Sequence, residues 1–481
     1  MRKDSAEKSL RSSFESLRTN GGAVETIGEF PFMLSLVEAF LGFVSRLRKL
    51  SCSFFCLLFL VSAVNAAQIS LEVVGQGMPK YPIAISPLKN TGAAADPGRI
   101  STGIADSIVY DLDLSGWFRV LDRAAYIEDP QKSGDTLGGF DFKDWSTIGA
   151  VGLVKGRFAV QGDDLTVELR LFDVAQSKEL IGKRYVAKAR DFRRIAHKFA
   201  DEIINQFTGT PGVFNTRIAY VSTSGGRFKE IHVAHLDGTE RFQVTNNRTI
   251  NLFPSWTSDG KSVIYTSYKD RSPGLYQFEL FTGKEVKWSP ANGRYMGGQA
   301  SPDGQHVVAT VEIAGNSNLY LLDANGKVVR QLTSDPGIEV SPAWSPDGRQ
   351  IVYVSDRSGS PQLYILDVAG GKSHRLSYSG SYNTAPAWSP KGDRIAYTGR
   401  VGRRFAIFTI SVDGGAARQL TSESYDSEDP AWAPDGRFIA FASNRAGRYH
   451  LYVMQAVGEN QRRLTGSGGD DTKPSWSPRL D

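Results

Sequence analysis

A short phrase recurs through the second half of this chain at a constant interval. It reads WSPDG at 344–348, with the near-copies WSPKG, WAPDG and WSPRL downstream and WTSDG and ASPDG upstream. The six copies begin at positions 256, 300, 344, 388, 432 and 476, so every step is 44 residues. A Leu-Tyr pair, as at Leu319 and Tyr320, keeps the same step. Self-similarity at a fixed period of this size is typical of repeat architectures.

Each repeat is predicted to hold four short strands. In the unit from 340 to 384, the segments PAW, IVYVS, LYILD and SHRLS have strand character, and SPDGR, DRSGSPQ and VAGGK separate them. Four short strands in a repeat of about 40–45 residues are typical of one propeller blade. The SPDG phrase is then the first hairpin turn, because Pro presets φ, Asp bonds its own backbone and Gly accepts a positive φ.

The tryptophan before this turn is predicted to fill the wedge between neighbouring blades, since an aromatic ring buries a large apolar area. Ala300 takes this place in one repeat and predicts looser packing there. The repeat tryptophans are Trp256, Trp344, Trp388, Trp432 and Trp476.

The ends of the repeat region predict how a ring would close. Residues 216–481 hold six units of this length. The segment at 216–222 has the pattern of a second strand without a Trp-Ser-Pro phrase before it, and 473–481 has the pattern of a first strand. The C-terminal strand is therefore expected to complete the blade begun at 216. It would close a six-bladed β-propeller and remove the exposed strand edges.

The region before the repeats has a mixed pattern. Apolar residues four apart from 100 to 112 predict a helix with Gly116 as its C-cap, and QGDD at 161–164 predicts a hairpin. Asp191 is predicted to cap a second helix that ends at Gly209. The predicted organisation is an N-terminal extension and signal peptide at 1–66, an α/β domain at 67–209, a linker at 210–215 and the propeller at 216–481.

Residues 1–66 are predicted to be cleaved off. Basic residues at 46–49 precede the apolar run LSCSFFCLLFLVSAV, and the small residues Val64 and Ala66 follow it, as in a secretory signal peptide. A membrane anchor is the alternative, but the run is too short for one. Residues 1–45 resemble an over-long translation start, with Met33 a candidate for the true one.

Composition argues against several classes of protein. Both cysteines, Cys52 and Cys56, fall in the apolar run, so the exported chain would have no disulfide, no cysteine metal site and no thiol nucleophile. Residues 67–481 carry 48 Lys and Arg against 45 Asp and Glu. This near balance does not indicate a nucleic-acid partner.

Catalytic motifs are weak or missing in the sequence. There is no G-x-S-x-G motif. His232 and His235 lie on a predicted strand, where positions i and i+3 point to opposite faces, so a surface role is favoured over a metal site. The GQG at 75–77 lacks the rest of a dinucleotide loop, and the carboxylates at 111–116 are expected to be solvated rather than to bind calcium. We therefore expect no enzyme activity, no cofactor and no metal.

The connections between blades are the predicted functional surface. The SPDG turns face one side of a propeller, and the connections from each outermost strand to the next inner strand open on the other side, around the channel mouth. Variable loops on a rigid scaffold often carry function. Arg294, Tyr295 and Met296 belong to residue types enriched at interfaces. An acidic arc is formed by Glu339, Glu428, Asp429, Asp470 and Asp471, although ordinary solvated loops remain an alternative.

The whole order of segments resembles the TolB family of the Tol–Pal system. The resemblance rests on a signal peptide, an α/β domain and six PAWSPDG…LYxLD…RQLT blades that end on KPSWSP. It implies a periplasmic, monomeric, non-enzymatic scaffold of the Gram-negative envelope, held at membranes through its partners. In that family the propeller binds the lipoprotein Pal and the mature N-terminus binds TolA, supporting outer-membrane invagination at division and envelope integrity; colicins and filamentous phage exploit the same system.

Carried onto this chain, the resemblance implies a TolA-binding segment at 67–75 and a Pal-binding set on the propeller loops. The TolA residues would be Ala67, Gln68, Ile69, Leu71 and Val73. The Pal residues would be Arg294, Tyr295, Met296, Gly297, Glu339, Val340, Asn383, Thr384, Glu428, Asp429 and Asp471. The alternative function is an exported propeller hydrolase acting on peptides or glycans inside the channel, but the inner strands offer mostly Pro, Ala, Ser and Trp.

Overall fold

The computed structural model describes residues 80–93, 95–96, 99–224, 226–289, 293–466 and 468–480, all of which belong to one compact unit. The predicted signal peptide, the predicted mature N-terminus and the GQG segment lie outside them. The described strands form seven sheets, one of six strands and six of four strands. No helix in the described part of the chain has the length and apolar character of a membrane span.

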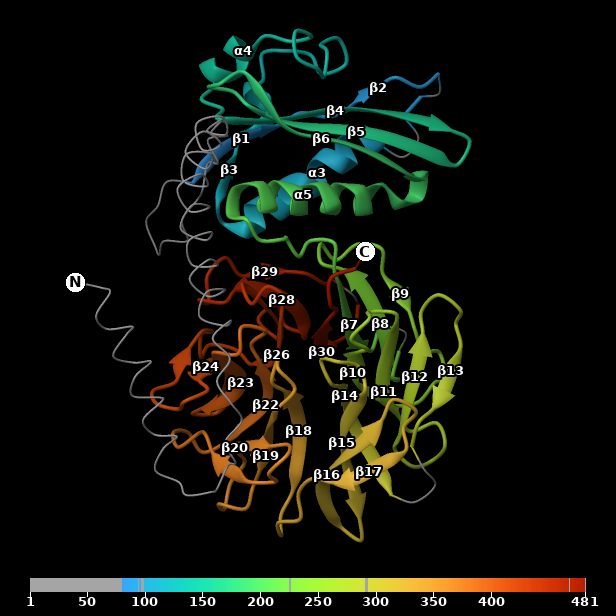
Figure 1. The fold of residues 1–481 in the computed structure, drawn as a ribbon, viewed down its shortest axis with the longest axis vertical. Helices are drawn as coiled ribbons and strands as arrows, with labels where there is room; N and C mark the ends of the chain where they lie inside the picture. Colours follow the sequence, from blue (N-terminus) through green and yellow to red (C-terminus); the bar gives the residue numbers. More distant parts are fainter. Residues whose placement is uncertain are drawn as a thin grey trace, which may run out of the picture. The chain divides into compact units, whose positions relative to one another are not determined.

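Residues 80–208 form the α/β part, which is built on a mixed sheet with the strand order β3-β1-β4-β5-β6 and with β2 paired to β4. β1 runs parallel to β3 and β4, and β4, β5 and β6 are antiparallel. α3 and α5 lie side by side on one face of this sheet (Figure 1). The elements are β1 Tyr81–Ile85, β2 Lys89–Asn90, α3 Ile100–Ser115, β3 Phe118–Val120, η1 Arg123–Ala125, α4 Phe142–Thr147, β4 Gly152–Gln161, β5 Asp164–Asp173, β6 Lys178–Lys188, η2 Ala189–Asp191 and α5 Phe192–Thr208.

Both long helices follow the sequence pattern, with one correction at a cap. Gly116 and Gly209 end α3 and α5 with φ values of 80° and 67°, in the left-handed region that glycine adopts without steric cost. Asp191 stands at the N-cap of α5, but its side chain makes no capping hydrogen bond. Its φ of −95° and ψ of 17° follow from the preceding η2 turn and depart from the extended backbone that a capping side chain prefers.

Residues 217–476 form the six four-stranded sheets of a propeller, as predicted. The first two sheets are β10 Asn251–Trp256, β11 Ser262–Ser267, β12 Gly274–Glu279 and β13 Glu285–Lys287, then β14 Arg294–Ala300, β15 His306–Ile313, β16 Asn316–Asp323 and β17 Val328–Gln331. The next two are β18 Glu339–Trp344, β19 Gln350–Ser355, β20 Gln362–Asp367 and β21 Ser373–Arg375, then β22 Asn383–Trp388, β23 Arg394–Val401, β24 Arg404–Ser411 and β25 Arg418–Gln419. The fifth is β26 Ser427–Trp432, β27 Phe438–Ser443, β28 His450–Gln455 and β29 Arg462–Arg463.

The sixth blade confirms the predicted closure. It combines β30, Asp471–Trp476, with β7 Arg217–Ser222, β8 Glu230–His235 and β9 Phe242–Gln243. β30 pairs antiparallel with β7, with Trp476 opposite Ile218. Because the last inner strand completes the blade that begins the repeat region, the ring is held shut by backbone hydrogen bonds between its two ends.

The SPDG phrase is built as a hairpin turn. In the third blade, Gly348 has a φ of 71° and donates its backbone N–H to Ser345 O at 3.0 Å. Asp347 accepts the Ser345 hydroxyl at 2.6 Å and the Arg349 N–H at 3.1 Å. The turn therefore satisfies its own polar groups, which explains why the phrase repeats.

The repeat tryptophans lie at the seams between blades and are 6–9% exposed. Trp344 Nε1 donates to Gln299 O of the preceding blade at 3.1 Å, and Trp432 Nε1 donates to Ala387 O at 3.0 Å. Trp344 and Trp432 therefore fill their seams and also tie two inner strands together.

The seam at Ala300 is filled from its other side. At this seam Trp288, which follows β13, is 8% exposed and packs in one apolar cluster with Ala300. At the other seams the residue equivalent to Trp288 is Val244, Leu332, Leu376, Leu420 or Leu464. The expected loosening is therefore offset. At this seam the aromatic ring comes from Trp288 at the outer edge of one blade, whereas at the other seams it comes from the inner strand of the next blade.

An exchange of these two residues tests the interpretation. Trp288→Leu alone is expected to leave a cavity and lower the free energy of unfolding by about 2–3 kcal/mol, and Ala300→Trp alone to overpack the seam by about 1–3 kcal/mol. The double variant recreates the Leu–Trp pairing of the other seams. Its loss of unfolding free energy, measured in urea, should therefore be smaller than the sum of the two single losses by more than about 1 kcal/mol. Simple additivity would contradict the exchange.

Candidate partner-binding site

Each inner strand contains one residue with a left-handed backbone, again in steps of 44. It is the third residue of the strand in five blades and the fourth in β14, which begins one residue earlier. These residues are Phe253, Gly297, Ser341, Ala385, Asp429 and Lys473, with φ between 47° and 59°. In each blade the pairing register shifts at this point, as between Val340 and Ala343. Such bulges bend a strand and redirect its side chains. Here they form the wall of the central channel.

The channel has a volume of about 370 Å³ and is lined by all six left-handed residues. Proline follows the left-handed residue in five blades, and Gly298 takes its place in the second blade. The residue before each left-handed residue is half-buried; these six are Leu252, Met296, Val340, Thr384, Glu428 and Thr472. These residues are apolar in the first three blades and polar in the last three, and they stand one position before the channel lining. Leu252 and Val340 also pack against the apolar clusters between blades. We call these six residues, together with the left-handed residues that follow them, the rim.

Charges at the rim are partly paired. Lys473 Nζ lies 3.1 Å from Asp429 Oδ1 of the neighbouring blade and 4.9 Å from the centre of the Phe253 ring on its other side, within reach of a cation–π contact. Glu428 Oε1 accepts the Tyr449 hydroxyl at 2.6 Å, and burial raises the pKa of Glu428. The rim therefore offers oriented polar groups beside an apolar surface, an arrangement suited to binding another polypeptide.

The predicted Pal-binding residues divide into two groups. Gly297 and Asp429 line the channel, and Met296, Val340, Thr384 and Glu428 are half-buried one position before it. Arg294 is exposed and paired with Glu312 at 3.2 Å. Tyr295, Glu339, Asn383 and Asp471 are at most 3% exposed. Asn383, for example, donates its side-chain amide to Gln362 Oε1 at 2.9 Å. The prediction that these four buried residues belong to a contact surface is therefore corrected, because their side chains point into the blades.

Two other predicted positions are also buried. His235 is 2% exposed and stacks on His197, so its expected surface role is wrong; His232 is half-buried beside Tyr220. Asp111 is fully buried and Asp113 is paired with Arg462, so these carboxylates are not simply solvated.

Within the described residues, no group of three or more His, Cys, Asp or Glu side chains is arranged to hold a metal ion.

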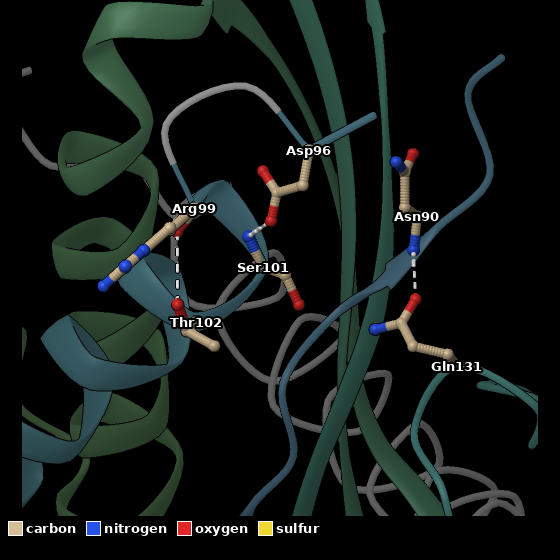
Figure 2. A pocket seen from close by; sticks show the side chains of 6 residues that line it. All are labelled: Asn90, Asp96, Arg99, Ser101, Thr102 and Gln131. Carbon is tan, nitrogen blue, oxygen red and sulfur yellow. Dashed lines mark hydrogen bonds between the residues drawn. The ribbon is translucent and has the colours of Figure 1, made fainter. Parts of the chain in front are cut away.

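A second hollow, of about 530 Å³, lies in the N-terminal part (Figure 2). Asp96 is one of the residues lining it, but its carboxylate accepts the backbone N–H groups of Ile100 and Ser101 at 2.7 and 3.0 Å. This contact satisfies the start of α3. The hollow is therefore a less suitable candidate than the propeller rim.

Comparisons with known proteins agree with the fold. Residues 204–480 match the family model described as the TolB beta propeller domain, and residues 69–180 match the TolB amino-terminal domain. The Tol-Pal system protein TolB of Desulfosudis oleivorans is 39% identical over 54% of this chain and 58% of its own length. That of Anaeromyxobacter dehalogenans strain 2CP-1 is 37% identical over 59% of this chain and 64% of its own length.

A solved structure extends this similarity. The crystal structure of TolB from Acinetobacter baumannii matches with a TM-score of 0.71 and 28% identity, covering 85% of this chain and 100% of that one. The sequence matches span about three-fifths of the curated relatives' length.

The buried Glu339 predicts a pH-dependent stability. Burial raises its pKa from 4.5 to about 7, and Arg357 Nη1 is 3.7 Å from Glu339 Oε1, beyond hydrogen-bond distance. The folded state holds the proton on Glu339 more tightly than the unfolded chain does. The free energy of unfolding therefore decreases as the pH rises from 4.5 to about 7. Glu339→Gln should therefore melt at a higher temperature than the parent at pH 8, with a smaller advantage at pH 5. A less stable variant at pH 8 would show that the carboxylate is a needed partner of Arg357.

Proposed function

This chain belongs to the TolB family, and from that premise we propose that it is a non-enzymatic adaptor of the Tol–Pal system that binds a protein partner at the channel mouth of its propeller. The observation that carries the proposal is the ring of six left-handed residues that line one channel, preceded by half-buried residues that are apolar in three blades and polar in the other three. A surface of this kind suits a polypeptide that inserts an apolar side chain and pairs its polar groups with the rim.

We propose Pal as the partner at this mouth. The contact surface is formed by the accessible members of the predicted set, which are Arg294, Met296, Gly297, Val340, Thr384, Glu428 and Asp429. The α/β part meets the propeller on the opposite side, at turns that include Asp237 and Asn460. This arrangement supports the proposal because the mouth stays clear of the α/β part.

We propose TolA as the second partner, bound by the predicted mature N-terminus. The support is the sequence alone: Ile69, Leu71 and Val73 alternate with other residues, as in a segment that adds a strand to a partner sheet. The signal-like segment at 46–66 supports a periplasmic location. Together the two partners would serve outer-membrane invagination at division and envelope integrity.

Substitutions at the apolar rim test the Pal proposal. Val340→Glu and Met296→Glu each place a charge where an apolar contact is proposed, and each is expected to weaken Pal binding at least ~10-fold, or ~1.4 kcal/mol, in calorimetry with purified mature proteins. Lys372→Glu, an exposed change in the β20–β21 turn on the opposite side, is the matched control. Unchanged affinity in both rim variants, with folding intact, would place the Pal site elsewhere, and reproducible turnover of a peptide or glycan would favour a hydrolase.

Removal of 67–75 tests the TolA proposal. The shortened mature protein is expected to lose TolA binding and to keep its affinity for Pal, because the deleted segment precedes every described element of the fold. Both affinities can be measured on the same preparations. Loss of both interactions, or of neither, would contradict this division of roles.

A further inference from the structure

A cluster of titratable side chains joins the α/β part to the propeller, on the side opposite the channel mouth. His197 of α5 is fully buried, and its Nδ1 lies 2.7 Å from Asp111 Oδ2 of α3. Its Nε2 lies 3.5 Å from Asp237 Oδ2, in the turn after β8 of the propeller. The imidazole therefore stands between a carboxylate of each part.

The same junction carries further polar contacts. Asn460 donates its side-chain amide to Asp113 O at 3.2 Å and to Leu114 O at 3.1 Å, and Gln455 donates to Ser115 O at 3.3 Å. These carbonyls end α3, where intrahelical donors are missing. The propeller therefore caps a helix of the α/β part, and the junction is a specific docking surface rather than a loose linker.

Other charged groups face His197 from the elements packed around it. From the propeller, His235 stacks on the His197 ring with centres 5.6 Å apart, and Glu240 Oε2 lies 3.0 Å from His235 Nε2. Arg217 acts on Glu240 electrostatically. From the helices, Asp201 of α5 acts on His197 at longer range.

The remaining groups near His197 are already engaged. The carboxylate of Asp201 accepts the Phe214 and Asn215 N–H groups at 2.7 and 3.0 Å. The Tyr110 hydroxyl of α3 donates to Leu236 O at 3.5 Å. Asp111 and Asp237 are therefore the carboxylates that contact the imidazole from each part.

We propose that His197 is a protonated bridge across this junction, so that docking of the α/β part on the propeller takes up a proton and weakens when His197 loses it. A neutral imidazole has one N–H and could donate to only one of the two carboxylates. An imidazolium carries a proton on each ring nitrogen, so that Nδ1 donates to Asp111 while the positive charge attracts Asp237, 3.5 Å from Nε2. This regulatory device goes beyond the proposed partner binding and does not depend on it.

The titration of the cluster gives the sign and range of the effect. Burial opposes the charge on His197, but the attraction of Asp111 and its hydrogen bond, together with Asp237, outweigh burial and raise the pKa of His197 from 6.5 to about 10. Burial raises the pKa of Asp111 to about 6 despite His197. Because Asp237 lies on the propeller, the docked state binds this proton more tightly than the undocked state, and the contribution of His197 to docking is lost as pH rises through about 10.

Nuclear magnetic resonance of histidine-labelled mature protein tests the protonation directly. His197 is expected to carry protons on both ring nitrogens at pH 8 and to titrate near pH 10. Asp237→Asn keeps an oxygen for the Thr239 N–H, which Asp237 Oδ1 accepts at 2.9 Å, but removes the charge facing His197. It should lower the His197 midpoint by at least about one pH unit. A neutral His197 at pH 8, or an unchanged midpoint in Asp237→Asn, would overturn the proposal.

Docking itself can be followed by fluorescence transfer. Residues 67–481 lack cysteine, so Lys178→Cys in the α/β part and Lys372→Cys in the propeller place one label on each part; both positions are exposed. In the parent protein, the urea concentration at which the two labels separate should decrease as the pH is raised from 7 to 10. In His197→Asn, checked for folding by circular dichroism, it should be lower and nearly independent of pH over that range. The same pH dependence in the parent and the variant would overturn the proposal.

Discussion

The pairing of β30 with β7 is the contact on which the rest of the structure depends. It joins residues more than 240 positions apart, Asp471 with Ser222 and Trp476 with Ile218, and converts a row of blades into a ring. The residues after β30 extend the closure: Asn215 Nδ2 donates to Leu480 O at 2.7 Å, and Arg479 Nε donates to Gly212 O at 3.1 Å. The tail therefore holds both the ring and the segment that leads into it.

Ring closure also creates the proposed binding surface. The six left-handed residues converge on one opening only because the inner strands meet around the channel. Lys473, on the closing strand, contacts Asp429 and Phe253 from the two blades beside it. A left-handed conformation costs about 1–2 kcal/mol for a residue with a side chain, and the repetition of this cost in five of six blades indicates that the bulge is required by the geometry of the inner strands.

The two ends of the channel differ in what surrounds them. At the mouth, half-buried side chains form the proposed binding surface. At the tight-turn end, amide groups of the fifth blade cap α3, and Asp237 of the sixth blade faces His197. One scaffold can hold both surfaces because a propeller separates its turns from its connections by the length of a strand.

The sequence by itself determined the repeat, the count of six blades, the hairpin turns, the closing strand and the long helices, because each depends on local chemistry and periodicity. Only the tertiary structure decided which side chains face the channel. The left-handed positions hold Phe, Gly, Ser, Ala, Asp and Lys, with no shared residue to predict them. It also buried Glu339, Asn383, Tyr295 and Asp471, and brought His197 to Asp237. A single contact such as that of His197 with Asp237 leaves no periodic signal in the chain, since it arises only when the elements pack.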